Sequence, residues 1–386
     1  MNKVLKVIIK LLIILLWVAL FYLQFERPYI SSLAQNLSPT LLPSVFLHNF
    51  FWLAWLAFPL LVLAFLKGRF FCWNICPLGL LQDLLPSGAD TRIRRTNRLI
   101  FLFLFGFAFF SLNLLAFFDP LVTLNRTVAS MKIRFAAAIV FLAPLILILL
   151  LSLIRRRWWC FKLCPLGALF DWIFRLKSSL REKGTPVDTG RRKALIVLGS
   201  GLLGGWLWRR FNLRKSELHR RLIRPPGAIN ENDFTDRCIR CGSCISVCLT
   251  GGLQPALLEG GIEGLFTPRL VPEIGECDEF CNKCGQACPT QAIRYLPLEE
   301  KRNFKMGTAR VDRNLCIAWD RDRLCLVCQE YCPYLAIRTV KNENGTPCPV
   351  VIEELCRGCG LCEKNCFAHP IHAIMVYNRG AGRFID

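Results

Sequence analysis

Histidine is scarce in this chain, and several familiar catalytic signatures are missing. Only four histidines occur in 386 residues, and only His48 lies in a long apolar run, so a helical bundle that holds haems between paired histidines is excluded. We find no dinucleotide-binding glycine pattern, phosphate loop or nucleophilic triad, and Gly201 to Gly205 lie in an apolar segment that indicates helix packing. The chemistry is therefore expected to belong to bound cofactors.

Acidic residues are few in the first half of the chain. Residues 1 to 208 contain 24 of the 49 basic residues but only 7 of the 28 acidic ones. This basic excess coincides with the most apolar part of the sequence and does not form a separate basic patch. A nucleic-acid partner is therefore not expected.

Long apolar runs fill the same half. Four of them are long enough to cross a hydrocarbon core of about 30 Å, and a shorter fifth follows: Val7 to Phe25, Val45 to Leu66, Leu99 to Phe118, Phe135 to Ile154, and Ala194 to Trp208. Basic residues are dense before the first run and after the second and fourth. The positive-inside rule places these segments in the cytoplasm. We predict an α-helical membrane domain with four to five transmembrane helices.

A repeated motif follows the second and fourth runs. GRFFCWNICPLGLLQDLL and RRWWCFKLCPLGALFDWI align at a constant offset of 88 residues (Cys72 with Cys160, Cys76 with Cys164). The offset indicates a two-fold internal repeat. Two cysteines four apart share one face of a helical turn, so the two motifs together supply four thiolates, enough for one iron–sulfur cluster. Buried packing residues, a reactive thiol pair and a zinc site are the alternatives.

Sixteen further cysteines form four groups in the second half of the chain. The groups are Cys238, Cys241, Cys244 and Cys248; Cys277, Cys281, Cys284 and Cys288; Cys316, Cys325, Cys328 and Cys332; and Cys356, Cys359, Cys362 and Cys366. Triplets followed by a fourth cysteine are typical of ferredoxins with two [4Fe-4S] clusters, in which the fourth thiolate binds the neighbouring cluster. A disulfide framework or zinc knuckles fit this spacing less well. We predict an α+β ferredoxin-like domain that binds four [4Fe-4S] clusters.

The exchange of fourth cysteines is expected to be nested. The segment between the second and third groups reads as a hairpin inside one two-cluster ferredoxin, so Cys332 is assigned to the second triplet and Cys288 to the third. The outer groups then exchange Cys366 and Cys248. Cys348 has no assigned role, and an ordinary buried thiol is expected.

Three stretches carry a family resemblance. LIRPPGAINENDFTDRCIRCGSCISVC, LQPALLEGGIEGLFTPRLVPEIGEC and GTARVDRNLC resemble the NapG/MauM family of periplasmic polyferredoxins, and the two C-x3-C-P motifs resemble the NapH/MauN/NosR group of membrane iron–sulfur proteins. Together the chain looks like a NapH–NapG fusion. Leu249 and Phe367 depart from the family by replacing the usual proline after the fourth cysteine. The chain also lacks the flavin domain of NosR and the cytoplasmic ferredoxin of NapH.

The resemblance implies a quinol dehydrogenase module in a bacterial cytoplasmic membrane. We expect a membrane domain over residues 1–176, a linker with a twin-arginine-like motif and a fifth apolar helix over 177–215, and a polyferredoxin domain over 216–386. Quinol within the lipid would be the electron donor, and a periplasmic reductase or c-type cytochrome the partner. From its place in an apolar run, His48 is a candidate proton acceptor or, equally, a helix-packing histidine. The polyferredoxin domain is expected in the periplasm, although a fifth run lying on the membrane would leave it inside.

This topology predicts a gap in the electron path. Cytoplasmic C-x3-C-P thiolates and a periplasmic polyferredoxin would be separated by about 30 Å of hydrocarbon. Two other functions stay open: an accessory protein for assembly or reductive activation of a metalloenzyme, and a polyferredoxin that the helices merely anchor. The accessory protein need not react with quinol, and the anchored one would not need the C-x3-C-P cysteines.

Overall fold

A computed structural model describes residues 3–23, 38–39, 51–85, 97–108, 117–133, 135–181, 189–211, 221–257, 259–261 and 263–384. It divides the chain into two compact units. Unit 1 comprises Met1–Met131, Ala138–Arg214 and Thr235–Ser243, and unit 2 comprises Lys132–Ala137, Lys215–Phe234 and Cys244–Asp386. Unit 1 thus includes the loop that carries the first two cysteines of the first ferredoxin group, so this loop packs with the apolar half of the chain.

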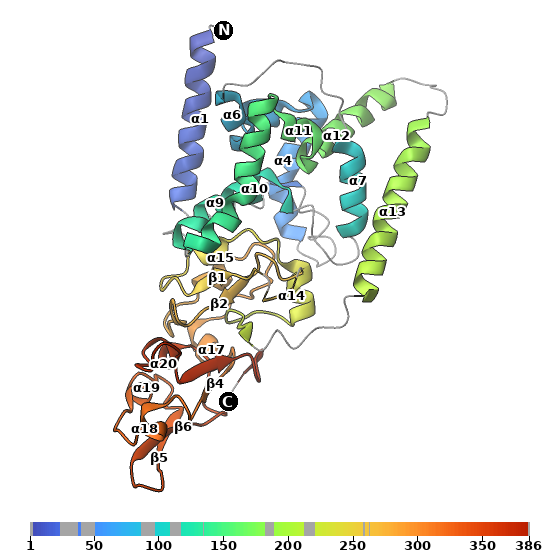
Figure 1. Cartoon of the computed structure of the whole chain (residues 1–386). Helices are drawn as coiled ribbons and strands as arrows, with labels where there is room; N and C mark the ends of the chain where they lie inside the picture. Colours follow the sequence, from blue (N-terminus) through green and yellow to red (C-terminus); the bar gives the residue numbers. More distant parts are fainter. Residues whose placement is uncertain are drawn as a thin grey trace. The chain divides into compact units, whose positions relative to one another are not determined.

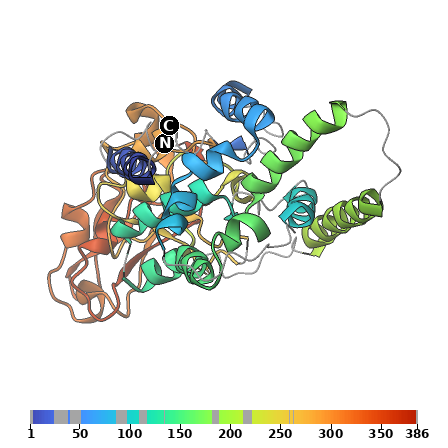
Figure 2. The ribbon, with the colours of Figure 1, turned by 90° about the horizontal axis from the view of Figure 1, so that it is seen from above.

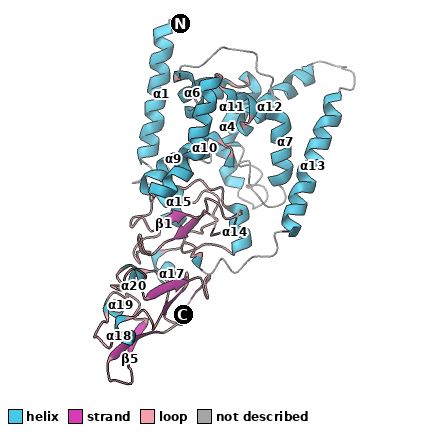
Figure 3. Ribbon diagram, viewed as in Figure 1, coloured by secondary structure: helices cyan, strands magenta, loops and turns pink. Residues whose placement is uncertain are grey.

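Helices make up the regular structure described in unit 1 (Figures 1 and 3). Its helices are α1 (Lys3–Leu23), α4 (Phe51–Lys67), α5 (Phe70–Asn74), α6 (Pro77–Leu84), α7 (Asn97–Ala108), α9 (Pro120–Ala129), the 3-10 turn Ser130–Lys132, α10 (Phe135–Ile154), α11 (Trp158–Lys162), α12 (Pro165–Arg181) and α13 (Thr189–Phe211). The repeat is visible in this order, because α4, α5 and α6 correspond to α10, α11 and α12. Each long apolar helix leads into a short cysteine-bearing helix and then into a helix that starts with proline.

Glycines bring α7 and α13 into close contact, and the two helices lie side by side in both views (Figures 1 and 2). A Cβ on Gly201 would lie 2.4 Å from the carbonyl oxygen of Phe103, and one on Gly106 would lie 2.8 Å from that of Leu198. Backbones can approach this closely only where side chains are missing. The prediction that the glycines of this segment serve helix packing is confirmed at Gly201.

One helical segment among the described residues is long and apolar enough to cross a membrane. It is Ala137–Ile154 of α10, with a mean hydropathy of 3.0, and the apolar parts of three other helices are shorter: Ile8–Leu20, Ala57–Lys67 and Lys193–Leu207. Parts of the first three predicted spans (residues 24–25, 45–50 and 109–116) and His48 lie outside the described residues. Four to five spans therefore stay a prediction.

Unit 2 consists of short helices and antiparallel strand pairs. Its strands are β1 (Leu253–Pro255), β2 (Pro268–Leu270), β3 (Phe304–Lys305), β4 (Thr308–Val311), β5 (Ile337–Lys341), β6 (Pro347–Val351), β7 (Ile374–Tyr377) and β8 (Arg383–Phe384). Its helices are α16 (Lys283–Gln286), α17 (Leu298–Asn303), α18 (Ile317–Asp320), α19 (Val327–Glu330) and α20 (Leu361–Lys364); α14 (Glu231–Arg237) and α15 (Ser243–Ser246) cross the unit boundary. Figure 3 shows the strands as short arrows between loops.

Two ferredoxin-like modules follow one another in the chain. In the first, an antiparallel bridge between Ala228 and Ile293 encloses the pair β1–β2. In the second, the pair β4–β7 encloses the hairpin β5–β6. β3 pairs with β8 at the end of the chain, so the segment between the second and third cysteine groups forms no hairpin of its own. This segment joins two modules, which contradicts the predicted hairpin.

Candidate iron–sulfur sites

The four cysteines of the repeat lie in unit 1 and are buried. Cys72, Cys76, Cys160 and Cys164 are 6%, 4%, 8% and 4% exposed. Cys76 has an extended backbone (φ −61°, ψ 118°) because it precedes a proline, and that proline occupies the first position of α6. In the motif C-x3-C-P one short helix thus ends two residues before the second cysteine, and the next helix starts directly after it.

Cys72, Cys76 and Cys164 belong to one buried cluster, and the charges of the four thiols act on one another. Burial raises the pKa of Cys72, and the neighbouring Cys76 and Cys160 raise it further. Burial also raises the pKa of Cys164, with Cys160, Cys72 and Cys76 adding to the effect. Four thiols that oppose each other's ionisation in a buried place are a suitable ligand set for a cationic iron centre, which would hold them as thiolates.

An arginine from the first half of the repeat holds the second half. Arg69 donates from Nε and Nη2 to both carboxylate oxygens of Asp171, at 2.8 and 2.7 Å, and from Nη1 to the carbonyl oxygen of Cys160 at 3.1 Å. Its guanidinium also lies 5.1 Å from the ring centre of Phe161. Burial lowers the pKa of Arg69, but the hydrogen bond and charge of Asp171 outweigh it and raise the pKa, so this side chain stays a cation.

The equivalent arginine of the second half holds the first half in the same way. Arg157 donates from Nε and Nη2 to Asp83, at 2.8 and 2.6 Å, and from Nη1 to the carbonyl oxygen of Cys72 at 3.2 Å. It stacks 4.1 Å from the ring centre of Trp73. Lys10 adds a further bond to Asp83 at 2.6 Å. We call these crossed contacts the reciprocal arginine clamp.

The clamp explains why the motif is duplicated. Each arginine binds the aspartate, the cysteine carbonyl and the aromatic residue of the other repeat, so each half fixes a cysteine of the other. The predicted site did not include the two arginines, although they share the offset of 88 residues with the cysteines. Gly79 and Gly167 share the offset too. A Cβ there would lie 2.6 Å from the carbonyl oxygen of Cys72 and 3.2 Å from that of Cys160, respectively.

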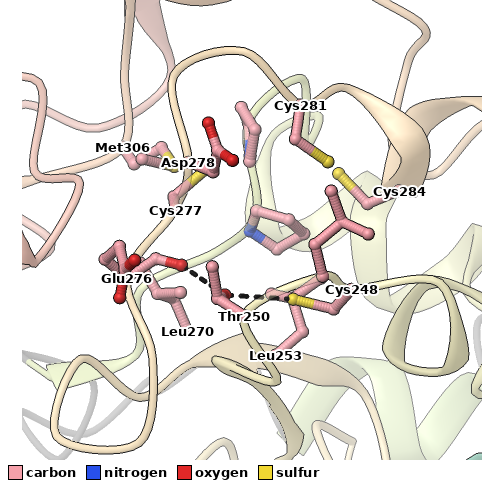
Figure 4. A pocket seen from close by; sticks show the side chains of 13 residues that line it. Cys248, Thr250, Leu253, Leu270, Glu276, Cys277, Asp278, Cys281, Cys284 and Met306 are labelled. Carbon is pink, nitrogen blue, oxygen red and sulfur yellow. Dashed lines mark hydrogen bonds between the residues drawn. The ribbon is translucent and has the colours of Figure 1, made fainter.

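The second ferredoxin triplet lines a cavity in unit 2 with about 420 Å³ of empty space, part of it open to solvent. Cys277, Cys281 and Cys284 line it together with Cys248, and Figure 4 shows the four sulfur atoms around one space. Thr250 lies 3.6 Å from the sulfur of Cys248 and donates to the carbonyl oxygen of Glu276 at 2.6 Å. The fourth cysteine of the first group therefore completes the second triplet.

The third and fourth triplets exchange their fourth cysteines with each other. Cys366 joins the third triplet around a cavity of about 360 Å³, lined by Cys316, Cys325, Cys328 and Cys366. Cys332 joins the fourth triplet around a cavity of about 330 Å³, lined by Cys332, Cys356, Cys359 and Cys362.

The nested assignment is therefore wrong: Cys332 does not join the second triplet, Cys366 does not join the first, and Cys248 does not join the fourth. Cys288 lines none of these three cavities, so the cysteines that would share a cluster with it are inferred only by elimination. The physical reason is strand pairing, because β4–β7 and the Ala228–Ile293 bridge close each module around two consecutive groups.

The three cavities suit a cluster with several metal atoms. All 21 cysteines are free, which contradicts a disulfide framework. Within the described part of the chain, no three His, Cys, Asp or Glu side chains converge on a point as ligands of a single ion. Backbone amides point to the sulfurs, with Ala309 N donating to Cys356 Sγ at 3.4 Å and Ala336 N to Cys332 Sγ at 3.3 Å. Such hydrogen bonds tune the potential of a bound cluster.

Cys348 belongs to none of these cavities. It lies in β6 with no exposed surface, and its thiol donates to the carbonyl oxygens of Ala318 and Thr346 at 3.3 and 3.5 Å. These contacts are those of a buried structural thiol.

The sites of unit 2 follow one another in space. The backbone amide of Cys277 donates to the carbonyl oxygen of Cys359 at 2.8 Å, which joins the second cavity to the fourth. Cys328 of the third cavity acts electrostatically on Cys362 of the fourth. The spatial order in unit 2 is second, fourth, third, and the third cavity lies next to α18 and the hairpin β5–β6 at one end of this unit (Figure 1).

Comparison with known proteins identifies the family. The chain is 34% identical over 214 residues to the methylamine utilization ferredoxin-type protein MauM of Paracoccus denitrificans, covering 50% of this chain and 93% of MauM. The chain belongs to this family of ferredoxin-type proteins. It is also 37% identical over 156 residues to the ferredoxin-type protein NapG of Escherichia coli, covering 37% of this chain and 65% of NapG. It is 32% identical over 155 residues to NapF of the same species, covering 39% of this chain and 82% of NapF.

A second match lies in the apolar half of this ferredoxin-type protein. A 4Fe-4S binding domain family matches residues 49–89 and 137–183. These two segments contain the two C-x3-C-P motifs. No solved structure matches the chain. The protein is therefore an iron–sulfur electron-transfer protein related to MauM, NapG and NapF.

Proposed function

We propose that the protein oxidises quinol at a membrane domain and passes the electrons through its ferredoxin modules to a periplasmic reductase or c-type cytochrome. The observation that carries this proposal is the reciprocal arginine clamp, which brings four cysteines of the repeat together in unit 1. In this reading they hold a fifth cluster beside the four of the ferredoxin groups.

Exposed apolar side chains support the membrane assignment. Leu12, Leu15 and Leu16 on α1 are 60%, 62% and 61% exposed, and Ile154 at the end of α10 is 69% exposed. Contiguous apolar surface of this kind is stable against lipid and unfavourable in water. The three shorter apolar segments belong to α1, α4 and α13, each of which adjoins residues outside the described part of the chain.

The electron balance of this reaction is simple. Oxidation of one quinol to the quinone releases two electrons and two protons. A [4Fe-4S] cluster supplies one-electron storage when bound, so two sites on the chain take up the electrons of one quinol. The protons leave to the aqueous phase on the side where the quinol is oxidised.

Anaerobic reduction tests the proposal. The full chain is reconstituted in lipid vesicles, a reduced quinone is added, and the electron paramagnetic resonance (EPR) signals of the ferredoxin clusters are recorded. We expect reduction in the native protein and none in Cys164→Ala, whereas dithionite reduces the ferredoxin clusters in both. Reduction by dithionite but not by quinol in the native protein would favour the accessory function, and unchanged reduction in Cys164→Ala would favour a polyferredoxin with a membrane anchor.

Reporter fusions test the sidedness. A reporter that is active only outside the cytoplasm is fused after Asp386, and a second copy is inserted in the segment Leu85 to Arg92. We expect activity only at the first position. Inactivity at both positions would place the ferredoxin modules in the cytoplasm and overturn the periplasmic partner.

A further inference from the structure

One short helix of unit 1 contacts two sets of cysteines. On one side of α9, Leu121 and Leu124 belong to the buried apolar cluster that contains Cys72, Cys76 and Cys164. The charge of Asp119, which caps the start of α9 and accepts from Leu121 N at 2.8 Å, acts on the thiol of Cys76. The start of α9 therefore belongs to the same buried cluster as three of the repeat cysteines.

Another side of α9 holds the loop of the first ferredoxin triplet. Val122 packs with Ile239 and Cys241 in a second buried cluster. Asn125, which has no exposed surface, donates from Nδ2 to the carbonyl oxygen of Cys241 at 2.9 Å and to the hydroxyl of Ser243 at 2.9 Å. These bonds fix the backbone of the cysteine loop on the helix.

Arg126 brings a positive charge to the same loop. It is fully buried, and its Nε donates to the carbonyl oxygen of Arg240 at 2.8 Å. Its guanidinium lies 4.4 Å from the ring centre of Phe117 and interacts electrostatically with Cys238 and Cys241. A cation in this position favours additional negative charge on a group held by these two cysteines.

The geometry of α9 shortens the expected electron path. Leu124 lies on one face of the helix and Val122 and Arg126 lie on the other, with Leu121 and Asn125, four residues apart, between them. A helix with its side chains is about 10–12 Å across, so a path through α9 from one face to the other is about one helix width long. The expected gap of about 30 Å depends on the sidedness of the two halves and stays a prediction.

We propose that α9 is the bridge over which electrons pass from the repeat cysteines to the first ferredoxin triplet, with Arg126 as the positioning residue that favours their arrival. The inference rests on the proposed function for the presence of a cluster at each end. Each transfer moves one electron from the repeat site to the first triplet and requires no proton at α9. Because electron-transfer rates fall exponentially with distance, a path of one helix width is far faster than one across a bilayer.

Magnetic coupling between the two sites tests the bridge without any turnover. The full chain is reduced completely with a low-potential reductant. The EPR signal of the first ferredoxin cluster is identified as the one that is lost in Cys241→Ala, and pulsed EPR records its relaxation rate in the other proteins. We expect this signal to relax several-fold more slowly in Cys164→Ala than in the native protein. The matched control is the double variant Cys316→Ala/Cys366→Ala, which removes a distant cluster and should leave the rate unchanged. Equal relaxation in the native protein and in Cys164→Ala would overturn the bridge.

Replacement of Arg126 tests its part. We expect Arg126→Gln to lower the equilibrium constant for reduction of the first ferredoxin cluster at least tenfold, which is 59 mV for one electron, and Arg126→Lys to restore most of it. The exposed Arg302→Gln serves as the control, with no shift. An unchanged reduction potential in Arg126→Gln would contradict the role of the charge. So would a lowered potential in Arg126→Lys, if this variant binds the native amount of iron. Redox titration with mediators needs no quinol, so a failure of quinol oxidation is distinguished from a failure of this inference.

Discussion

Loss of one arginine of the reciprocal clamp should destabilise unit 1 strongly. In Arg69→Gln the bidentate bond to Asp171 is lost, and both side chains of this pair are buried, with 7% and 8% exposed. Removal of one partner from a buried ion pair costs about 3–5 kcal/mol, because the remaining charge loses its counter-charge in a place from which water is excluded. For a unit of this size each kcal/mol lowers the melting temperature by about 2–4 °C, so we expect a decrease of about 6–20 °C.

Thermal unfolding of the purified full chain in detergent, followed by circular dichroism, measures this decrease. Two controls separate the buried pair from a general effect of charge. Arg302→Gln breaks the exposed pair with Glu279, whose arginine is 49% exposed, and should cost less than about 1 kcal/mol. Arg69→Met combined with Asp171→Leu removes both charges and should recover most of the loss. Equal melting temperatures for Arg69→Gln and Arg302→Gln would refute the argument that the clamp holds the two halves together.

Three further predictions concern the sites. Gly79→Ala should lower the amount of iron bound by the repeat, because the new Cβ would lie 2.6 Å from a backbone carbonyl oxygen. Gly199→Ala is the control and should bind the native amount of iron, because a Cβ there meets no described atom outside its own helix within 4 Å. Iron analysis compares the two variants. The double variant Cys316→Ala/Cys366→Ala should lose the iron of one cluster, because both cysteines line one cavity; loss of two clusters would restore the nested assignment. Cys348→Ala should keep all its iron and lose about 0.5–3 kcal/mol of stability in thermal unfolding; loss of iron would contradict its exclusion from the sites.

The second, third and fourth triplets each line one cavity, as their spacing predicts, because the cysteines of one triplet are neighbours in the chain. The fourth ligand is different. Cys248 and Cys332 reach cavities formed by the next group, and which group that is depends on strand pairs such as β4–β7, whose partners are about 65 residues apart. No local sequence pattern shows whether consecutive groups exchange their fourth cysteines or whether the exchange is nested. The prediction of nested exchange was therefore wrong.

The clamp and the contacts of α9 also depend on residues that are far apart in the sequence. The equal offset of Arg69 and Arg157 is present in the sequence, and it marks the residues without showing that each binds the opposite repeat. Asn125 and Arg126 carry no motif, and a short helix after an apolar run reads as a simple linker. Their complete burial against Cys241 and Arg240 depends on a loop more than 100 residues further along the chain.

The iron content of the full chain tests most directly whether the repeat cysteines hold a cluster. Iron and acid-labile sulfide are measured per chain in the native protein and in Cys72→Ala/Cys160→Ala, both purified without oxygen. Five [4Fe-4S] clusters predict about 20 iron atoms per native chain and about 16 in the variant, with the EPR signals of the ferredoxin groups unchanged. About 16 iron atoms in both proteins would contradict the account, because the repeat would then bind no cluster.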